Sequence, residues 1–200
     1  MAWQRAFDRH ELHFPLWRIH RTVGMGGDKL VGEVAGDEVE ERLGDDLREA
    51  WKQEYAELEA EVDPLPGSRD LVRALAADGW QVALASSGEP EFAERALDSL
   101  GVRDDVSVLT TAADVEASKP DPDLLQVTLE KLGVSRAVMV GDTPYDVQAA
   151  ARAGLACVTL RSGGFGEAEL TDAGAVLVVG TPADLLDLDW EQHLRPVDRS

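Results

Sequence analysis

Polar residues that could bind a phosphate follow the first of several short apolar runs in this chain. Ser86, Ser87 and Gly88 come directly after the run that ends at Ala85. Hydroxyls and free backbone N–H groups at the entrance of a helix are suited to hold phosphoryl oxygens. Such a turn is also an ordinary way to start a helix, and taken alone these residues favour that simpler interpretation.

A lysine framed by prolines follows later in the chain. Lys119 precedes Pro120 within the segment 118–123, and the proline ring keeps the preceding residue out of the α region, which fixes the direction of the lysine. A lysine in a loop is usually only solvated. This chain, however, has four lysines against fifteen arginines, so a lysine kept at this place indicates that a compact point charge is required.

Two aspartates stand four residues apart at another strand end. Asp142 falls at the end of the apolar run 137–140, after Gly141, and Asp146 falls in the first turn of the helix expected next. Paired carboxylate oxygens at a strand end suit Mg²⁺, which prefers hard oxygen ligands. One of the two aspartates could instead cap the helix, and the residues alone leave both roles open.

Alternating helices and apolar strands must position these three groups. From residue 68 onward the expected order is helix 68–78, strand 81–85, helix 91–100, strand 106–109, helix 122–132, strand 137–140, helix 146–153, strand 156–160 and strand 175–179. Such alternation, with valine-rich runs that lack strict period two, is typical of a doubly wound α/β domain, a parallel sheet covered by helices on both faces. Ligands of such sheets bind off the carboxyl ends of the strands, where all three groups lie.

The first third of the chain has a different pattern. Residues 1–62 predict helices, with apolar side chains near helical spacing and a glycine-rich break at residues 23–28. Two prolines and a glycine within residues 63–67 end this pattern. We therefore expect an α-helical domain over residues 1–62 and an α/β domain over residues 63–200.

Composition limits the partners of the protein. The 39 acidic residues against 19 basic ones give a formal charge of -20, which repels nucleic acid and anionic membranes. No apolar stretch approaches the roughly 20 residues of a membrane span, and no signal segment opens the chain. Cys157 is the single cysteine and lies in an apolar run, which predicts a buried structural thiol, a reducing compartment and a cytoplasmic location.

The order hydroxyl, lysine and Gly-Asp-x-x-x-Asp resembles the second, third and fourth motifs of the haloacid dehalogenase (HAD) superfamily. The likeness covers nearly the whole chain. The helical first segment looks like the α-helical cap of the phosphoglycolate phosphatase and β-phosphoglucomutase branch. Further matching dipeptides precede a helix or a strand, namely Pro66-Gly67, Asp78-Gly79 and Ala153-Gly154.

The resemblance implies a Mg²⁺-dependent phosphatase with a HAD-like Rossmannoid core. An aspartate at the end of the first strand would attack the phosphoryl group, and water would hydrolyse the resulting aspartyl-phosphate. Ser86 would bind phosphoryl oxygens, with Ser87 and Gly88 beside it. Lys119 would neutralise the charge of the nucleophile and the phosphoryl group. Asp142 would hold Mg²⁺, and Asp146 would support the metal directly or through water.

The family's Asp-x-Asp motif should stand shortly before the cap. Residues 1–7 read as already inside the first cap helix, and Asp8 lies within that helix, where it cannot act as the nucleophile. We therefore expect the first core strand to be missing from this chain. A natural protein that begins further upstream explains this better than an inactive relative, because an inactive relative need not keep all the other motif residues.

The cap is the expected source of substrate choice. The glycine-rich loop 21–29 lets the backbone approach a ligand, and Arg21 and Lys29 are its cationic candidates. A plain turn between helices with solvated charges is an equally good interpretation. A small phosphorylated metabolite such as phosphoglycolate, a sugar phosphate or a nucleotide suits this pattern.

Two other classes of protein share part of the pattern. A phosphoacceptor receiver domain has its acidic residues before its lysine and has no helical cap, whereas here Asp142 and Asp146 follow Lys119. A non-catalytic protein that keeps the phosphate and Mg²⁺ pocket for binding or regulation is the more serious alternative. Such a protein would bind phosphorylated metabolites without turnover.

Overall fold

The computed structural model describes residues 1–194, and the chain divides into two compact units, Met1–Asp63 and a second that starts at Pro64. None of the helices in the described part of the chain is long and apolar enough to cross a membrane.

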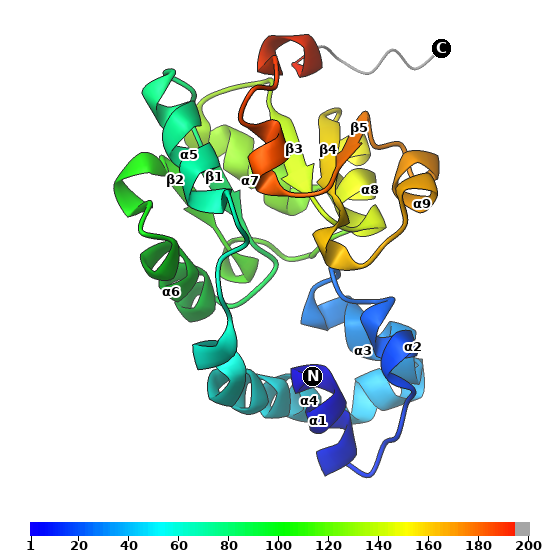
Figure 1. Ribbon diagram of the computed structural model, residues 1–200. Helices are drawn as coiled ribbons and strands as arrows, with labels where there is room; N and C mark the ends of the chain where they lie inside the picture. Colours follow the sequence, from blue (N-terminus) through cyan, green and yellow to red (C-terminus); the bar gives the residue numbers. More distant parts are fainter. Residues whose placement is uncertain (195–200) are drawn as a thin grey trace. The chain divides into compact units, whose positions relative to one another are not determined.

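The first unit is entirely helical (Figure 1). Its elements are α1 (Ala2–Arg9), α2 (Leu16–His20), α3 (Gly27–Ala35), α4 (Asp37–Leu58) and a 3-10 turn (Glu59–Glu61). Helix α4 packs against both α1 and α3. The core of the unit consists of Phe7, Ile19, Leu30, Val31, Val34 and Leu47.

Between residues 64 and 194 the second unit has five strands, which pair in parallel: β1 (Ala83–Ala85), β2 (Val108–Thr110), β3 (Val138–Gly141), β4 (Ala156–Leu160) and β5 (Leu177–Val179). Its α-helices are α5 (Ser68–Ala77), α6 (Pro90–Leu100), α7 (Asp123–Leu132), α8 (Pro144–Arg152) and α9 (Glu167–Asp172). Short 3-10 turns lie at Arg103–Asp105, Ala112–Asp114, Arg161–Gly163, Pro182–Leu185 and Trp190–His193. The α/β class predicted from the sequence is confirmed.

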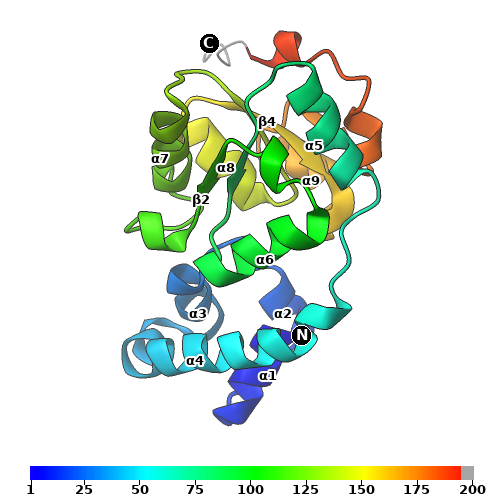
Figure 2. The same cartoon turned by 90° about the vertical axis from the view of Figure 1, so that its left-hand side faces the viewer.

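Strand β4 lies at the centre of this unit, and all five of its side chains are buried. On one face Cys157 packs with Leu125 of α7 and Val147 of α8. On the other face Val158 and Leu160 pack with residues of α5 and of the Pro182–Leu185 turn. Figure 2 shows α7 and α5 on either side of the strands. Helices cover both faces because the strand presents apolar side chains on both of them.

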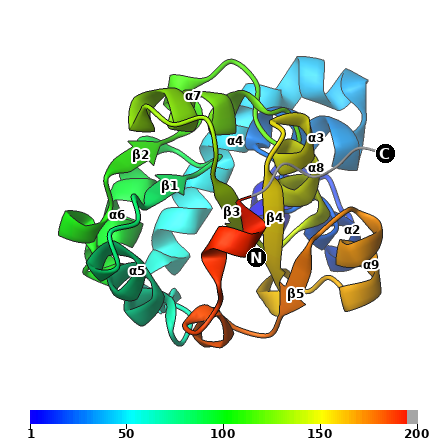
Figure 3. The ribbon, with the colours of Figure 1, turned by 90° about the horizontal axis from the view of Figure 1, so that it is seen from above.

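The strands form two sheets, whereas the alternating pattern predicts one. Strand β1 pairs with β2, and β3, β4 and β5 form a separate sheet in that order (Figure 3). The edge of β1 away from β2 and the edge of β3 away from β4 have no strand partner among residues 1–194. One apolar cluster nevertheless contains both Ala85 of β1 and Met139 of β3, so both sheets share a core.

Several boundaries differ from the sequence prediction. Helix α8 begins at Pro144, two residues before the expected start, because Thr143 caps it and proline is favoured in the first helical turn. Helix α3 begins at Gly27, so Lys29 belongs to a helix and not to a loop. Helix α9 was not expected, since its six residues carry too little periodic signal.

Candidate functional site

The turn after β1 carries Ser86, Ser87 and Gly88. The Ser86 amide donates to the carbonyl of Thr110 at 2.9 Å, which fixes the turn to the end of β2. The Gly88 amide donates to Ser86 Oγ at 3.1 Å. Ser87 Oγ is buried and has no hydrogen-bond partner within the described residues. A buried hydroxyl without a partner is costly, so a bound oxygen atom at this turn would stabilise it.

Lys119 lies before α7 and reaches the start of α8. The peptide bond between Lys119 and Pro120 is cis. The lysine Nζ donates to Asp146 Oδ1 at 2.8 Å, and the exposed fractions of the two side chains are only 13% and 4%. These residues are 27 positions apart in the sequence. The structure therefore brings together two of the predicted site residues in one nearly buried ion pair.

Asp146 also caps helix α8. Its Oδ2 accepts the amide of Asp142 at 3.0 Å, the amide of Thr143 at 3.0 Å and the hydroxyl of Thr143 at 2.8 Å. Burial by itself raises the pKa of this carboxyl, but the Lys119 charge and the hydrogen bonds outweigh it, so the net pKa lies below the usual value. Asp146 is thus held as a carboxylate that caps the helix and binds Lys119. A contact of Asp146 with a metal stays a prediction.

The same capping arrangement recurs after two other strands. Thr111 with Asp114 follows β2, and Thr181 with Asp184 follows β5. Asp114 also pairs with a lysine, Lys131, but the exposed fractions of that pair are 31% and 37%. The capping aspartate is therefore a general device of this fold, and burial together with Lys119 is what distinguishes Asp146.

The carboxylate of Asp142 takes no part in the cap of α8. It follows β3 directly, and its Oδ2 accepts a hydrogen bond from Ser162 Oγ at 2.9 Å. Burial raises the pKa of Asp142, the hydrogen bond from Ser162 opposes this, and the negative charge of Asp146 adds to the rise. A cation beside Asp142 would relieve the cost of its ionised form.

Two glycines allow this close packing. A Cβ atom at Gly141 would overlap the side chain of Asp146, and one at Gly163 would overlap the backbone of Asp142. Ser162 and Gly163 were not among the residues predicted from the sequence. They follow strand 156–160 directly, so the rule that ligand sites lie off the carboxyl ends of strands could have found them.

Within residues 1–194 no three or more His, Cys, Asp or Glu side chains gather in a group that could hold a metal ion. Asp142 fits Mg²⁺ as one hard oxygen ligand, at a site where burial disfavours an uncompensated carboxylate. The other ligands of an octahedral Mg²⁺ would have to come from the substrate, from water or from a further carboxylate.

The two cationic residues predicted in the cap lie in the first unit. Arg21 follows α2 and is exposed, and Lys29 is half-buried in the first turn of α3. Arg48 of α4 donates to the carbonyl of Gly27 at 3.1 Å and fixes the start of α3. The predicted contact of Arg21 and Lys29 with a substrate remains a prediction.

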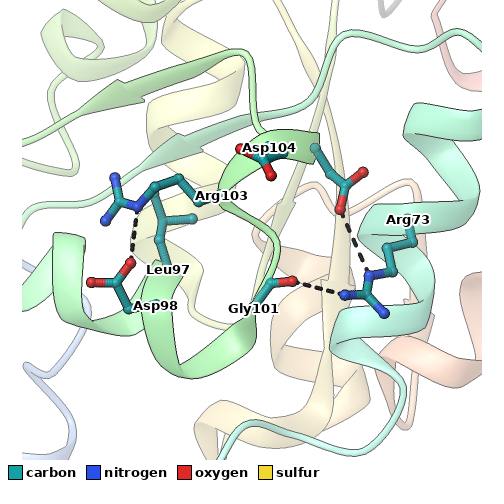
Figure 4. A pocket seen from close by; sticks show the side chains of 7 residues that line it. Arg73, Leu97, Asp98, Gly101, Arg103 and Asp104 are labelled. Atoms are coloured by element: carbon teal, nitrogen blue, oxygen red, sulfur yellow. Dashed lines mark hydrogen bonds and ion pairs between the residues drawn. The ribbon is translucent and has the colours of Figure 1, made fainter.

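A hollow of about 520 Å³ lies away from all of these residues (Figure 4). Its lining residues lie near the amino end of β2, whereas Ser86 lies at the carboxyl end of that strand. Arg73 donates to the carbonyl of Gly101 at 3.0 Å, and Arg103 donates to Asp98 at 2.9 Å. Because local acceptors engage both guanidinium groups, this hollow has no charge available for a phosphate.

Comparison with known proteins agrees with these features. The family model described as haloacid dehalogenase-like hydrolase matches residues 1–154. The candidate phosphatase YhcW of Bacillus subtilis (strain 168) is 28% identical over 118 residues, which are 58% of this chain and 54% of YhcW. The matched stretch therefore spans about half the length of this curated relative.

Solved structures show the same fold. A hydrolase from Pseudomonas syringae is 32% identical, with a TM-score of 0.86, and the match covers 92% of this chain and 87% of that one. CbbY from Rhodobacter sphaeroides, solved in complex with phosphate, is 22% identical with a TM-score of 0.75, and the match covers 94% of this chain and 90% of CbbY. With the hydroxyl turn after β1, the largely buried Lys119 and the paired aspartates after β3, the chain belongs to the haloacid dehalogenase-like hydrolases.

Proposed function

We propose that this protein is a Mg²⁺-dependent phosphatase that hydrolyses the phosphomonoester of a small metabolite through an aspartyl-phosphate. One observation carries the proposal most: the Lys119–Asp146 ion pair of 2.8 Å, which is largely buried beside Asp142. A charge kept at this depth without a catalytic or binding role would be a poor way to stabilise a fold, because burying an ion pair gains little.

The phosphoryl group binds between the turn after β1 and Lys119. The hydroxyl of Ser86 and the unpartnered hydroxyl of Ser87 supply hydrogen bonds to its oxygens. The Gly88 amide, which donates to Ser86 Oγ, would turn to the phosphoryl group when that group binds. The Lys119 ammonium stabilises the negative charge that the phosphoryl group and its attacking carboxylate share. Asp146 keeps this ammonium in place from the opposite side.

Asp142 is the metal ligand of this proposal. Asp142 would hold Mg²⁺, which would supply positive charge to offset that of the phosphoryl oxygens. Asp146 then acts on the site through Lys119, because its two oxygens already accept four hydrogen bonds.

The nucleophile belongs to a strand that pairs between β1 and β3 in this proposal. Both strands have an unpaired edge within residues 1–194, and both contribute to one apolar cluster. A parallel strand inserted there would place the residues after it between Ser86 and Asp142, within reach of a bound phosphoryl group. The Asp-x-Asp motif expected from the family would supply the nucleophile and the acid and base.

A small phosphorylated metabolite is the substrate class we favour. CbbY binds phosphate, and a variant of CbbY was solved with xylulose-(1,5)bisphosphate. The charge of -20 disfavours nucleic acid as a partner. Arg21 and Lys29 are the candidate substrate contacts of the helical unit, and the free, buried Cys157 suits a reducing compartment such as the cytoplasm.

The test is hydrolysis of p-nitrophenyl phosphate with and without Mg²⁺. The protein isolated from its source cells should turn over the substrate only with the metal, and Lys119→Ala should lower kcat by several orders of magnitude. The 200-residue chain alone should bind phosphate without turnover. A Lys119→Ala variant with a near-normal rate would contradict the assignment of the site.

A binding or regulatory protein of the same family is the alternative function. It keeps the same phosphate and Mg²⁺ contacts and predicts measurable affinity for phosphorylated metabolites. The protein from source cells would then bind them, with affinity lowered in Lys119→Ala, and show no Mg²⁺-dependent turnover of any phosphomonoester offered.

A further inference from the structure

Ser162 contacts the carboxylate to which the proposed function assigns the metal. Its Oγ donates to Asp142 Oδ2 at 2.9 Å, across 20 residues of sequence. Ser162 belongs to none of the three motifs that identify the site. The three motifs therefore do not account for this contact.

The strand register explains why these two residues meet. Gly141 of β3 stands opposite Thr159 of β4 in the parallel ladder. The chain that leaves β4 therefore runs beside the chain that leaves β3. The 3-10 turn Arg161–Gly163 ends up against Asp142 as a consequence of this pairing.

Close packing holds this turn against the backbone of Asp142 as well. A Cβ atom at Gly163 would overlap the carbonyl oxygen of Asp142. The turn thus touches Asp142 at two points, the backbone through Gly163 and the carboxylate through Ser162. The hydrogen bond from Ser162 is the contact of this turn that restricts the rotation of the Asp142 side chain.

The other side of the turn is held near the end of β5. The Arg161 guanidinium lies 3.4 Å from the position that a Cβ would take at Gly180. Its charge also acts on Asp184, the aspartate that caps the turn after β5. The turn therefore lies between the ends of β3 and β5, with its hydrogen bond to Asp142 on the β3 side.

We propose that Ser162 is a positioning residue that holds the Asp142 carboxylate in the orientation required to bind Mg²⁺. The inference rests on the proposed function for the identity of the cation. The hydroxyl donates to Oδ2 and so sets the orientation in which the carboxylate meets a cation. Hydrogen bonds to a ligating carboxylate commonly change metal affinity by about 10- to 100-fold.

The experiment uses nuclear magnetic resonance on the 200-residue chain and on three variants. The couplings between the Hα and Hβ protons of Asp142 report, without metal, whether its side chain keeps one rotamer. A Mg²⁺ titration followed at the amides of residues 141–143 gives the Kd. Ser162→Ala removes the hydroxyl, Ser162→Thr keeps it, and Ser135→Ala removes an exposed serine near the opposite end of β3.

We expect the couplings of Asp142 to show one rotamer in the wild-type chain, Ser162→Thr and Ser135→Ala, and an average of rotamers in Ser162→Ala. The Kd for Mg²⁺ should rise about tenfold in Ser162→Ala alone. All four proteins should unfold at similar temperatures, because Ser162 is exposed and makes no core contact.

Couplings in Ser162→Ala that match the wild type would overturn the inference, with or without metal. An unchanged Kd for Mg²⁺ in Ser162→Ala would overturn it too. A wild-type chain that keeps one rotamer, loses it in Ser162→Ala and shows no response to Mg²⁺ would support the positioning contact but contradict the metal assignment of the proposed function.

Discussion

Lys119 and Asp146 form an ion pair of 2.8 Å in which the carboxylate is almost completely buried. The aspartate is held from one side by the cap of α8 and from the other by the lysine. Removal of Asp146 leaves the largely buried Lys119 ammonium without its carboxylate, and removal of Lys119 leaves Asp146 Oδ1 without its donor.

Asp146→Asn should lower the free energy of unfolding at pH 7 by about 3–5 kcal/mol, the usual cost of removing one member of a buried pair. Asparagine keeps an oxygen for the cap, so the loss reports the charge facing Lys119. Asp184→Asn is the matched control, since that aspartate caps the turn after β5 in the same way at an exposed position. Equal losses in urea unfolding would show that Lys119 adds nothing.

The same pair makes stability depend on pH. The pKa of the Asp146 carboxyl in the folded state lies below the unfolded value of about 3.9. Asp146 therefore stabilises the fold above that pH and loses this effect as the pH falls through the folded pKa. We expect the difference in unfolding free energy between wild type and Asp146→Asn to be constant above about pH 5 and to shrink below about pH 4. A difference that does not change between pH 6 and pH 2.5 would contradict this.

Asp142 should behave in the opposite way. Its pKa is raised, chiefly by burial, so its ionised form destabilises the metal-free fold, and the favourable contribution of the protonated form is lost as pH rises through the folded pKa. Asp142→Asn should therefore raise the melting temperature at pH 7 in the presence of EDTA. The gain should vanish below about pH 4. In Mg²⁺ the wild type should be stabilised and the variant should not, as thermal unfolding would show.

Gly163→Ala should destabilise the chain by about 1–3 kcal/mol, because the added Cβ meets the backbone of Asp142, which cannot rotate away. Gly166 lies three residues further, and a Cβ there meets nothing within 4 Å. Gly166→Ala should cost less than about 1 kcal/mol, the difference between glycine and alanine at a helix N-cap. Chemical denaturation of both variants measures the contrast, and similar costs would argue against close packing at Gly163.

Cys157 should be unreactive in the folded protein. Burial raises the pKa of its thiol to about 12, and the side chain is 2% exposed. Iodoacetamide requires an accessible thiolate, so labelling at pH 8 should be very slow without denaturant and rapid in guanidinium chloride. Fast labelling of the native chain, measured by intact mass, would mean that β4 opens readily.

The sequence alone determined the elements whose signal is local. Residues 156–160 form β4 with the expected bounds, because four of the five residues are apolar and lie on both faces, so burial on both faces is favoured. The order of hydroxyl, lysine and paired aspartates pointed to the family before any contact was known, and the burial of Cys157 is confirmed. These features depend on the order and spacing of residues near one another in the chain, which can be read without knowledge of the fold.

Tertiary structure decided what depends on residues far apart in the chain. The Lys119–Asp146 contact spans 27 residues and the Ser162–Asp142 contact spans 20, and both follow from which strands pair and in which register. The choice between cap and metal ligand for Asp146 also needed its partners, since a carboxylate in a first helical turn suits either role. The division of the strands into two sheets has the same origin: a strand bonds to whatever edge folding brings beside it, and no local pattern encodes that partner.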